Sequence, residues 1–465
     1  MDRDIVVLGG GPGGYYAAIR AAQLGAKVTL IEKETLGGTC LNLGCIPTKA
    51  LYRNAQILNT LKNIDQYGIY VNDYNIDISK IQERKQNIIK QLVEGISKLM
   101  NANKVEVIYG KGILKDKNTV SITLSNGEQI EVRGKNIIIA TGSKVLVPPI
   151  PGADLEGILT SKEILDFKEI PKRLIIIGGG VIGIEFATIF NALGSEVTVI
   201  ELYNNILDKV ELDLSKRLTV SLKKKGIQIY TDTAANKIQK ENNEFVVYAQ
   251  GKKGKLKVEA DCVLLASGRA PQVEGINLEG LEIEFDQKGI KVDENFKTNI
   301  DHIYAIGDSI GKKMLAHVAS HQGMIVSEKI MGIKSTINQE VIPDCVFTFP
   351  EIASVGITEQ EAKSKGIAYH TSKFLFGANG KALTLGESEG MVKVIANEKD
   401  EIIGVHIMGP HASDLIHEGA LAIGTKMKVD NISNIIHAHP TLSESLSEAI
   451  LGLKGEAIHM VPSKR

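Results

Sequence analysis

The sequence has 465 residues but few cysteines. Only four are present, namely Cys40, Cys45, Cys262 and Cys345. A chain of this size that depended on disulfide bonds for stability would need many more, which excludes a disulfide-rich secreted fold. Two of the four cysteines lie only five positions apart. This close pair is therefore a candidate for chemistry.

The sequence also lacks an excess of charge of either sign. Its 54 Lys and Arg residues are balanced by 55 Asp and Glu residues, which gives a net charge of -1. Without a Lys/Arg-rich patch, the electrostatic attraction to phosphate that drives nucleic-acid binding is missing. Nucleic acid is thus not expected as a partner. The content of 43% hydrophobic and 23% charged residues is typical of a globular protein, and the length predicts about three or four compact units.

No long, uninterrupted hydrophobic run is present either. The longest apolar stretch, residues 174–190, contains several glycines and Glu185, so it does not suit a membrane span of about 20 residues. At the N-terminus, Met1–Asp4 leads directly into the apolar segment Ile5–Leu8 without the basic and apolar regions of a signal peptide. We therefore expect a cytoplasmic protein with no membrane association.

An internal repeat is the most informative feature that is present. In both copies an apolar segment runs into a glycine-rich turn, and an acidic residue lies 18 positions after the last glycine. Every position of the second copy lies 169 residues after its counterpart. The first copy contains Gly9, Gly11, Gly14 and Glu32, and the second contains Gly178, Gly180, Gly183 and Glu201.

Each copy has the pattern of a dinucleotide-binding βαβ unit, in which G-x-G-x-x-G follows a strand and opens a helix. The first glycine permits a tight turn, the second lets a pyrophosphate approach the backbone, and the third lets the helix pack on the sheet. The N–H groups at the start of the helix then bind the anion. A glycine-rich turn that binds nothing is a reasonable interpretation of one copy alone. The recurrence of strand, glycines, helix and acid favours two dinucleotide sites.

The two acidic residues predict the type of nucleotide. Glu32 and Glu201 can accept hydrogen bonds from a ribose 2′-hydroxyl, whereas a carboxylate would repel a 2′-phosphate. No Arg or Lys follows Glu201 until Lys209. The second site is therefore predicted to bind NAD and not NADP.

Two further segments resemble each other. Residues 137–142 and 263–268 are apolar strands that end in small-residue turns, which suits a chain that returns over a bound dinucleotide. Thr141, Gly142 and Gly268 lie in these turns. The proline-rich stretch 147–152 has the composition of a linker, and another boundary is expected near residues 341–343.

A helix is predicted around residues 81–99, where apolar residues recur at helical spacing. We expect this stripe to face the core, and we assign no chemistry to it. Its members are Ile81, Ile88, Leu92, Ile96 and Leu99.

The close cysteine pair has a redox-active arrangement. On a regular helix, residues five positions apart point in different directions, so a bond between Cys40 and Cys45 needs a turned backbone, which Gly44 allows. Pro47 suits the first turn of a helix predicted over Thr48–Leu58, and a thiol near a helix N-terminus has its thiolate stabilised.

Metal binding is the competing interpretation of the pair. Zinc and iron–sulfur sites need further cysteine or histidine ligands nearby, and the next cysteine along the chain is Cys262. Cys262 and Cys345 lie in apolar segments and are predicted to be unreactive core thiols.

Several motifs together resemble the class I flavoprotein disulfide reductases. They are GGTCLNLGCIPTK at residues 37–49, the preceding glycine motif, and HAHPTLSE at residues 437–444. The likeness covers nearly the whole chain, and it is greatest to the members that oxidise dihydrolipoamide. It includes TNIDHIYAIGD at residues 298–308, LAH at residues 315–317 and PEIASVG at residues 350–356.

The resemblance implies an α/β fold with two Rossmann-like dinucleotide-binding domains, one for FAD and one for NAD, and a C-terminal α+β dimerisation domain. The cofactors it implies are FAD and NAD, and the oligomer is a homodimer. The expected domains are residues 1–146 for the first part of the FAD domain, 147–270 for the NAD domain, 271–342 for the second part of the FAD domain, and 343–465 for the dimerisation domain.

The resemblance also implies roles for individual residues. Cys40 would be the interchange thiol that reacts with substrate, and Cys45 the charge-transfer thiol against the flavin. Lys49 and Glu185 would pair near the flavin, where the nicotinamide arrives. Without the resemblance, both would be ordinary polar residues on helix surfaces. The remaining residues expected to contact FAD are Asp308, which would face the ribityl chain, and Leu315, Ala316 and His317, which would lie near the ring.

The histidine-rich segment 437–444 supplies a candidate base. Read from the residues alone, Thr441 and Glu444 have the spacing of a helix capping box. The resemblance instead implies that Glu444 orients His439 as a proton acceptor that reaches the disulfide of the other subunit. His439 is preferred to His437 because it precedes Pro440, as in the family motif.

The resulting functional prediction is the oxidation of protein-bound dihydrolipoamide to lipoamide with reduction of NAD⁺. The partner would be a lipoylated carrier protein of a 2-oxoacid dehydrogenase complex or of a glycine cleavage system. An NADPH-dependent reductase of glutathione-like disulfides is the alternative, but it would favour basic residues after Glu201. A flavoprotein that only binds a partner or senses redox state would need neither the cysteine pair nor the histidine.

Overall fold

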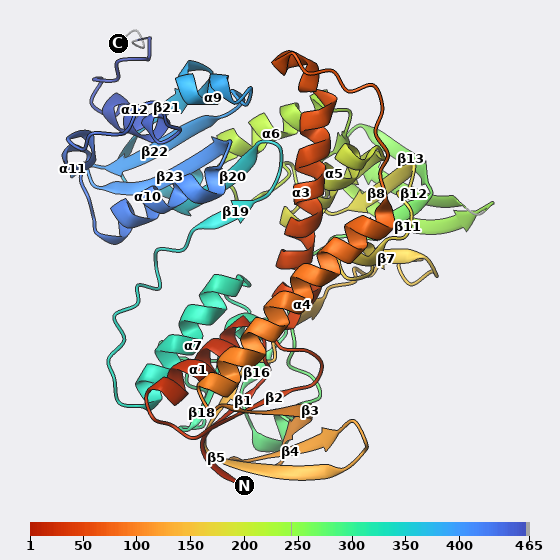
Figure 1. The fold of residues 1–465 in the computed structure, drawn as a ribbon, viewed down its shortest axis with the longest axis vertical. Coiled ribbons are helices and arrows are strands. Elements are labelled where there is room, and N and C mark those ends of the chain that lie inside the picture. The colour runs from red at the N-terminus through yellow and green to blue at the C-terminus, as the bar shows by residue number, and fades with distance from the viewer. Residues whose placement is uncertain (243, 462–465) are drawn as a thin grey trace.

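The computed structural model describes residues 1–242 and 244–461. Three large sheets organise the chain, each in its own part of the molecule (Figure 1). The N-terminal sheet lies at the bottom of the view, the second lies at the right, and the C-terminal sheet lies at the upper left.

The first sheet is a parallel sheet with an antiparallel extension. Residues 5–8, 28–31, 137–139 and 303–305 form buried, mainly apolar runs in it, as expected for parallel strands that are covered on both faces. Near residue 303 the chain returns to this sheet after it has passed through the second. The parallel order is β3 (Glu106–Leu114), β2 (Val28–Glu32), β1 (Asp2–Leu8), β5 (Gln129–Ile139) and β18 (Ile303–Ala305), and β4 (Thr119–Leu124) pairs antiparallel with β3 and β5.

The second sheet is parallel throughout. A three-stranded antiparallel sheet accompanies it, formed by β11 (Thr233–Glu241), β12 (Glu244–Gly251) and β13 (Gly254–Ala260). The parallel order is β10 (Gln228–Tyr230), β9 (Glu196–Ile200), β8 (Arg173–Ile177), β14 (Cys262–Leu265) and β7 (Ile158–Thr160).

The repeat found in the sequence is also a structural repeat. Helix α1 (Pro12–Gln23) connects β1 to β2, and α5 (Val181–Leu193) connects β8 to β9 in the same way. After β5 of the first sheet comes β6 (Ser143–Val145), and after β14 of the second comes β15 (Arg269–Pro271). These two short strands pair with each other. On the first sheet, α1 packs against α7 (Ala316–Ile330), and an ion pair of 2.6 Å joins Arg20 to Glu328.

The third sheet is antiparallel and carries helices, so the predicted fold class is confirmed. The strand order is β19 (Asp344–Val346), β20 (Glu351–Gly356), β23 (Ile402–Gly409), β22 (Met391–Asn397) and β21 (Tyr369–Leu375). Its helices are α8 (Glu359–Ser364), α9 (Gly380–Thr384), α10 (Ala412–Gly424), α11 (Val429–Ser433) and α12 (Glu444–Gly452). The domain boundaries given above stay predictions.

The start of helix α3 corrects one expectation from the sequence. Helix α3 (Cys45–Lys62) follows α2 (Gly38–Leu43) and begins at Cys45, earlier than the predicted start at Thr48. The other helices are α4 (Ile78–Ala102) and α6 (Leu212–Lys224). The minor elements are β16 (Phe285–Asp286), β17 (Gly289–Ile290) and short 3₁₀ turns at residues 64–67, 163–166, 279–281, 307–310 and 376–378.

The core-facing stripe predicted for α4 was wrong in part. Leu92 and Leu99 are 40% and 51% exposed, and the buried face carries Ile89 and Met100 instead. Adjacent apolar residues along α4 fit two faces equally well, so periodicity could not choose between them. The buried face also contains Lys85, whose Nζ donates to the Leu165 carbonyl at 2.6 Å.

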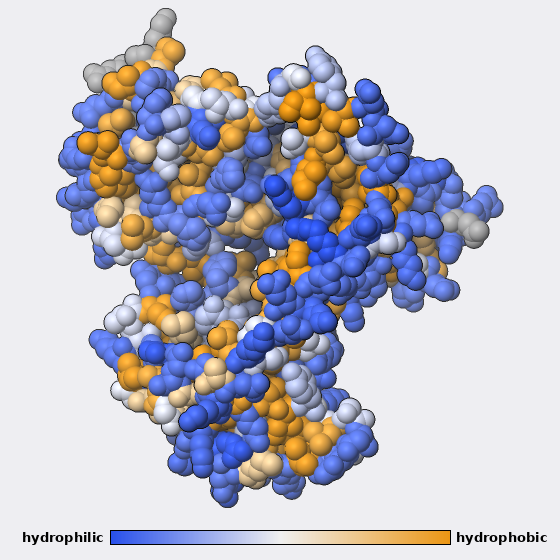
Figure 2. All heavy atoms as spheres, viewed as in Figure 1, coloured by the Kyte–Doolittle hydropathy of each residue, from blue (hydrophilic) through white to orange (hydrophobic). Residues whose placement is uncertain are grey.

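Figure 2 shows a hollow in the surface. It lies between the part of the molecule with the first sheet and α7 and the part with the third sheet. Among the described residues, no helix combines the length and hydrophobicity needed to cross a bilayer.

Candidate active site

A cavity of about 2550 Å³ contains most of the predicted site residues. A pocket for one drug-sized ligand measures roughly 300–1,000 Å³, so this cavity has room for two dinucleotides. Both glycine loops, both cysteines of the close pair, Lys49 and Glu185 line it. The structure thereby brings together segments from the two repeats.

The glycine loops have the geometry that each predicted role requires. In the second loop, Gly178 has a φ of +115°, and a Cβ on Gly183 would overlap the Gly178 carbonyl oxygen. A Cβ on Gly180 would have no described atom within 4 Å, so this position faces the cavity. The first loop repeats the arrangement with Gly9 at a φ of +110°, Gly14 against the Gly9 carbonyl, and Gly11 in open space up to Gly38 at 3.9 Å.

We predict that two alanine substitutions in the second loop have opposite consequences. Gly183→Ala forces α5 away from β8 and destabilises the second unit, because backbone atoms must move. Gly180→Ala leaves the melting temperature nearly unchanged and weakens nucleotide binding, because its methyl group occupies the space where a phosphate approaches the backbone. Thermal unfolding and NAD⁺ titration of both variants check this. A Gly180→Ala variant that binds NAD⁺ normally would contradict the assignment.

The two acids at the strand ends are held by backbone groups. One Glu32 carboxylate oxygen accepts from the Gly10 N–H at 2.7 Å, and the other accepts from the Glu34 N–H at 2.7 Å. Glu201 accepts in the same way from the N–H groups of Gly179 and Tyr203. Both carboxylates line the cavity, and each oxygen has a second lone pair available for a ribose hydroxyl.

The two similar return segments lie over the glycine loops, as the sequence predicts. A Cβ on Gly9 would overlap the Ala140 carbonyl, and a Cβ on Gly178 would come within 2.5 Å of the Ala266 carbonyl. The Thr141 hydroxyl donates to the Gln272 carbonyl at 2.7 Å, which joins the first return segment to the stretch that follows the second. Thr141, Gly142 and Gly268 all line the cavity.

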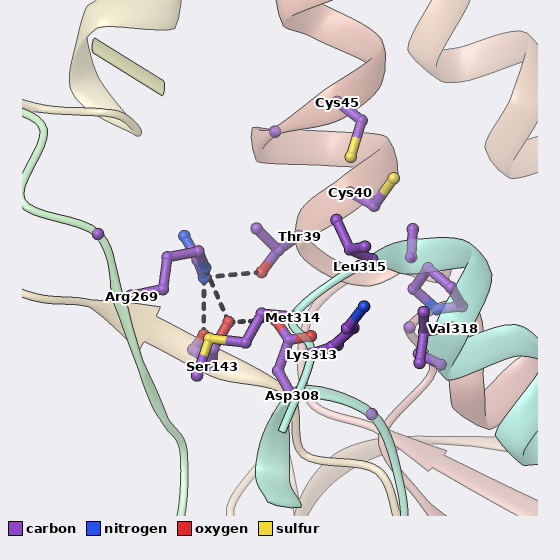
Figure 3. Close-up of a pocket in the computed structure, with 18 of the residues that line it drawn as sticks. Thr39, Cys40, Cys45, Ser143, Arg269, Asp308, Lys313, Met314, Leu315 and Val318 are labelled. Carbon is purple, nitrogen blue, oxygen red and sulfur yellow. Dashed lines mark hydrogen bonds between the residues drawn. The ribbon is translucent and has the colours of Figure 1, made fainter. Parts of the chain in front are cut away.

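The cysteine pair lies at a break between two helices. Gly44 ends α2 with φ −152° and ψ −109°, and this turn lets the side chains of Cys40 and Cys45 lie close together (Figure 3). Both thiols are free in the described chain. The turned backbone required by the five-residue spacing is therefore present.

The surroundings of the two thiols favour a proton on Cys40 and a thiolate on Cys45. The hydrogen bond that Cys40 donates, together with the Lys49 ammonium, lowers the pKa of Cys45 despite its burial. The same hydrogen bond and burial raise the pKa of Cys40. Burial raises the pKa of Cys262 to about 11 and that of Cys345 to about 12, which disfavours their reactive thiolates. The prediction that both lie in the core was wrong in part, because both are only partly buried and Cys345 lines the cavity.

Lys49 and Glu185 form an ion pair that joins α3 to α5. The distances from Lys49 Nζ to the two Glu185 carboxylate oxygens are 2.9 and 2.8 Å. The Phe347 N–H donates to Glu185 at 3.1 Å, and Lys49 Nζ lies 4.4 Å from the centre of the Phe347 ring. All three units of the molecule thus meet beside Cys45.

Asp308 belongs to a network that the sequence did not predict. The Ser143 hydroxyl donates to Asp308 at 2.5 Å, and Arg269 donates to the Ser143 hydroxyl at 2.7 Å and to Thr39 at 3.4 Å (Figure 3). Burial raises the pKa of Asp308, while Ser143 and Arg269 oppose this effect. The run Gly268-Arg269-Ala270-Pro271 was the sequence feature that could have pointed to Arg269. Its contacts with Ser143 and Thr39, however, arise only from the tertiary structure.

The LAH segment lies at the start of α7 and lines the same cavity. Leu315 is the residue before the helix, and Ala316 and His317 form its first turn. His317 Nε2 lies 3.0 Å from the Pro343 carbonyl oxygen, and burial lowers the pKa of His317.

Glu444 contacts both His439 and Thr441, the two residues that its alternative roles involve. One of its oxygens lies 2.8 Å from His439 Nδ1, and the other accepts from the Thr441 N–H at 2.8 Å. The capping box is only half formed, because the Thr441 hydroxyl donates to the Ala438 carbonyl. Burial raises the pKa of Glu444, but the Thr441 N–H and His439 outweigh it and lower the pKa overall.

A single chain does not bring His439 to the cysteine pair. The His439 side chain is 77% exposed, and neither His439 nor Glu444 is among the described residues that line the cavity. His437 instead lies 2.9 Å from Glu418. If His439 acts on a cysteine pair, that pair belongs to another copy of the chain.

Comparison with known protein families gives a match over most of the chain. Residues 3–323 match the pyridine nucleotide-disulphide oxidoreductase model, and residues 342–450 match the dimerisation domain of the same family. The chain belongs to the pyridine nucleotide-disulphide oxidoreductases. The dimerisation domain makes the protein a homodimer.

Relatives of this oxidoreductase include several dihydrolipoyl dehydrogenases. One from Bacillus subtilis is 42% identical over 98% of this chain and 99% of its own length. Dihydrolipoyl dehydrogenase 2 of Arabidopsis thaliana mitochondria is 40% identical over 99% of this chain and 92% of its own. The crystal structure of LpdA from Mycobacterium tuberculosis has a TM-score of 0.90 at 28% identity and covers 97% of this chain and 99% of its own.

The cofactors of this oxidoreductase are FAD and NAD. The residues of the cavity fit both groups, since two helix N-termini with open glycines face it and each is followed by an acid held at a strand end. The start of α7 lies beside the first loop, since a Cβ on Gly13 would come within 3.2 Å of the Ala319 carbonyl oxygen.

Proposed function

We propose that the protein is a dihydrolipoyl dehydrogenase, which oxidises dihydrolipoamide to lipoamide and reduces NAD⁺ to NADH. The observation that carries this proposal is the Cys40–Cys45 pair, with its thiolate on Cys45 beside Lys49, in a cavity that extends to both glycine loops. Relatives with this name are about 40% identical over nearly the whole chain.

In the first chemical steps, the chain's residues exchange thiols with the substrate. His439 of the partner subunit, oriented by its Glu444, accepts a proton from one substrate thiol. The resulting thiolate attacks Sγ of Cys40 in the oxidised pair, the Cys40–Cys45 bond breaks, and Cys45 leaves as a thiolate. Lys49 stabilises this leaving group, because its ammonium is one of the groups that favour the Cys45 thiolate.

The product leaves in a second exchange. The other substrate thiol attacks the substrate sulfur that is bonded to Cys40 and gives its proton to the Cys40 sulfur that leaves, which breaks the Cys40–substrate bond and releases cyclic lipoamide. Cys40 then holds this proton, as its raised pKa favours. Bound FAD would supply the two-electron chemistry that couples reoxidation of the pair to reduction of NAD⁺.

Within this proposal, each cofactor has its own residues. Gly9, Gly11, Gly14, Glu32, Thr141, Gly142, Asp308 and the segment Leu315–His317 would hold FAD, while Gly178, Gly180, Gly183, Glu201 and Gly268 would hold NAD. Lys49 and Glu185 would lie where the two cofactors meet.

A direct test is steady-state turnover of the purified protein with four substrate pairs. We expect turnover of dihydrolipoamide with NAD⁺, and at least about tenfold less with NADP⁺, because Glu201 repels a 2′-phosphate. Oxidised glutathione with NADH or NADPH should give little turnover. A preference for glutathione disulfide over dihydrolipoamide would contradict the proposal.

We further propose that the natural substrate is the lipoylated carrier protein of a 2-oxoacid dehydrogenase complex or of a glycine cleavage system. The His439 segment supports a substrate that reaches the site between two subunits. A cytoplasmic location is proposed as well, which suits a dithiol that must cycle. Turnover with each purified lipoylated carrier would identify the system, and no turnover with any carrier would count against this partner class.

A further inference from the structure

Lys393 is a fully buried lysine that the chemistry described above does not use. It lies on β22 of the third sheet and its side chain is 0% exposed. Its Nζ contacts three carboxylates, those of Glu211 at 2.6 Å, Asp213 at 2.7 Å and Glu359 at 2.5 Å. Glu211 and Asp213 belong to the start of α6 in the second unit, whereas Glu359 begins α8 in the third. This cluster, named the Lys393 cluster, therefore ties two units together.

The charges of the Lys393 cluster depend on one another. Burial alone would raise the pKa of Asp213, but hydrogen bonds from Lys373 and Lys393 outweigh it and lower the pKa to about 2. Hydrogen bonds from Lys363 and Lys393 likewise lower the pKa of Glu359 to about 2. Removal of one partner from a buried ion pair leaves the others uncompensated, which is strongly unfavourable.

Glu211 is the member of the cluster that directly follows residues of the cavity lining along the chain. Only 1% of its side chain is exposed, and its second oxygen accepts from the Glu359 N–H at 2.8 Å. Residues 202–210, which precede it, form the nucleotide loop that follows Glu201, and several of them line the cavity. In Figure 1, α6 lies beside the third sheet, in agreement with its contacts to β23.

The nucleotide loop is connected to the second glycine motif at one end and to the cluster at the other. The Leu207 N–H donates to the Gly179 carbonyl at 2.9 Å, and Leu207 has a φ of +50°, which is unfavourable for a leucine. The Ser215 hydroxyl on α6 donates to the Ile206 carbonyl at 2.6 Å. A shift of α6 would therefore reach the glycine motif through this loop.

We propose that Lys393 is a positioning residue for nucleotide binding: through Glu211 it holds the nucleotide loop 202–210 in place from the third unit. This inference rests on the proposed function, because it assumes that NAD occupies the second glycine motif. It predicts that NAD affinity depends on a residue of the dimerisation domain. That residue is not among the described residues that line the cavity.

The test is equilibrium binding of NAD⁺ and NADH to the FAD-loaded Lys393→Met enzyme. We expect both dissociation constants to rise by about tenfold, and KM for NAD⁺ to rise with them. The rate at which dihydrolipoamide reduces the enzyme in the absence of NAD⁺ should stay within about twofold, because the cysteine pair does not contact the cluster.

Lys373→Met is the matched control. Lys373 also contacts Asp213, at 2.7 Å, and its loss removes the same charge, but its ion pair is with Asp213 and not with Glu211. Its NAD⁺ affinity should equal that of the wild type. Equal affinity in Lys393→Met, with only a lower melting temperature, would overturn the inference and reduce the cluster to a structural role.

A second variant keeps the inference testable if Lys393→Met fails to fold. Glu211→Gln weakens the contact through which Lys393 acts and should raise the dissociation constant for NAD⁺ by about threefold. Unchanged affinity in this variant would overturn the inference. Failure of the wild type to bind NAD⁺ would instead count against the proposed function, so the two failures are distinguishable.

Discussion

Turnover should fall by at least about 10³-fold when either Cys40 or Cys45 is replaced by serine, because neither thiol alone can form the redox disulfide. The two variants should differ in their spectra. In FAD-loaded Cys40→Ser, the remaining Cys45 thiolate next to Lys49 should give a long-wavelength thiolate–flavin absorbance band. In Cys45→Ser the band should be absent, also after partial reduction with dihydrolipoamide.

The band in Cys40→Ser should depend on pH in a defined direction. It should appear as the pH rises through the pKa of Cys45, since only the thiolate contributes to it. The hydrogen bond from Cys40 is the largest effect that lowers this pKa, and the serine hydroxyl can still donate one. The transition should therefore move upward in Cys40→Ala, which has no donor, relative to Cys40→Ser, and Lys49→Met should move it further.

Cys262→Ser is the control for the two cysteine variants. Its thiol has a raised pKa and lies on β14, so turnover and spectrum should match those of the wild type. A band that persists in Cys45→Ser would contradict the role given to Cys45.

The second large effect concerns the origin of the base. His439→Gln should lower turnover by about 10²–10⁴-fold, the usual contribution of a general base. Mixed dimers of His439→Gln and Cys45→Ser subunits should regain activity. One of the two sites in each mixed dimer would then combine an intact cysteine pair with an intact histidine. A random mixture should reach about a quarter of the wild-type activity.

The same mixture shows whether the base acts within its own chain. If the base acted within its own chain, each subunit of a mixed dimer would carry one defect, and no activity would return. The control is each variant alone after the same exchange procedure, which should stay inactive. Glu444→Gln should lower turnover less than His439→Gln, because it removes the orienting carboxylate but leaves the base.

Local sequence patterns determined the cofactor loops. Gly9, Gly14, Gly178 and Gly183 occupy positions where a positive φ or a backbone contact leaves no room for a side chain, and such constraints act within a few residues of the chain. The break at Gly44 that lets Cys40 and Cys45 meet is local in the same way. For this reason the two βαβ units and the dithiol could be predicted from the sequence.

Contacts between distant segments were decided only by the tertiary structure. The apolar pattern of α4 fits two faces, and packing chose the one with Ile89 and Met100. Arg269 meets Asp308 through Ser143, and Lys393 meets Glu211, although 182 residues separate that pair along the chain. Their pairing depends on how whole sheets pack, which no local pattern encodes. His439 lies outside the cavity of its own subunit for the same reason. Residue types and spacings thus determined which chemistry this protein has, while the packing of its three sheets decided which charged groups position that chemistry.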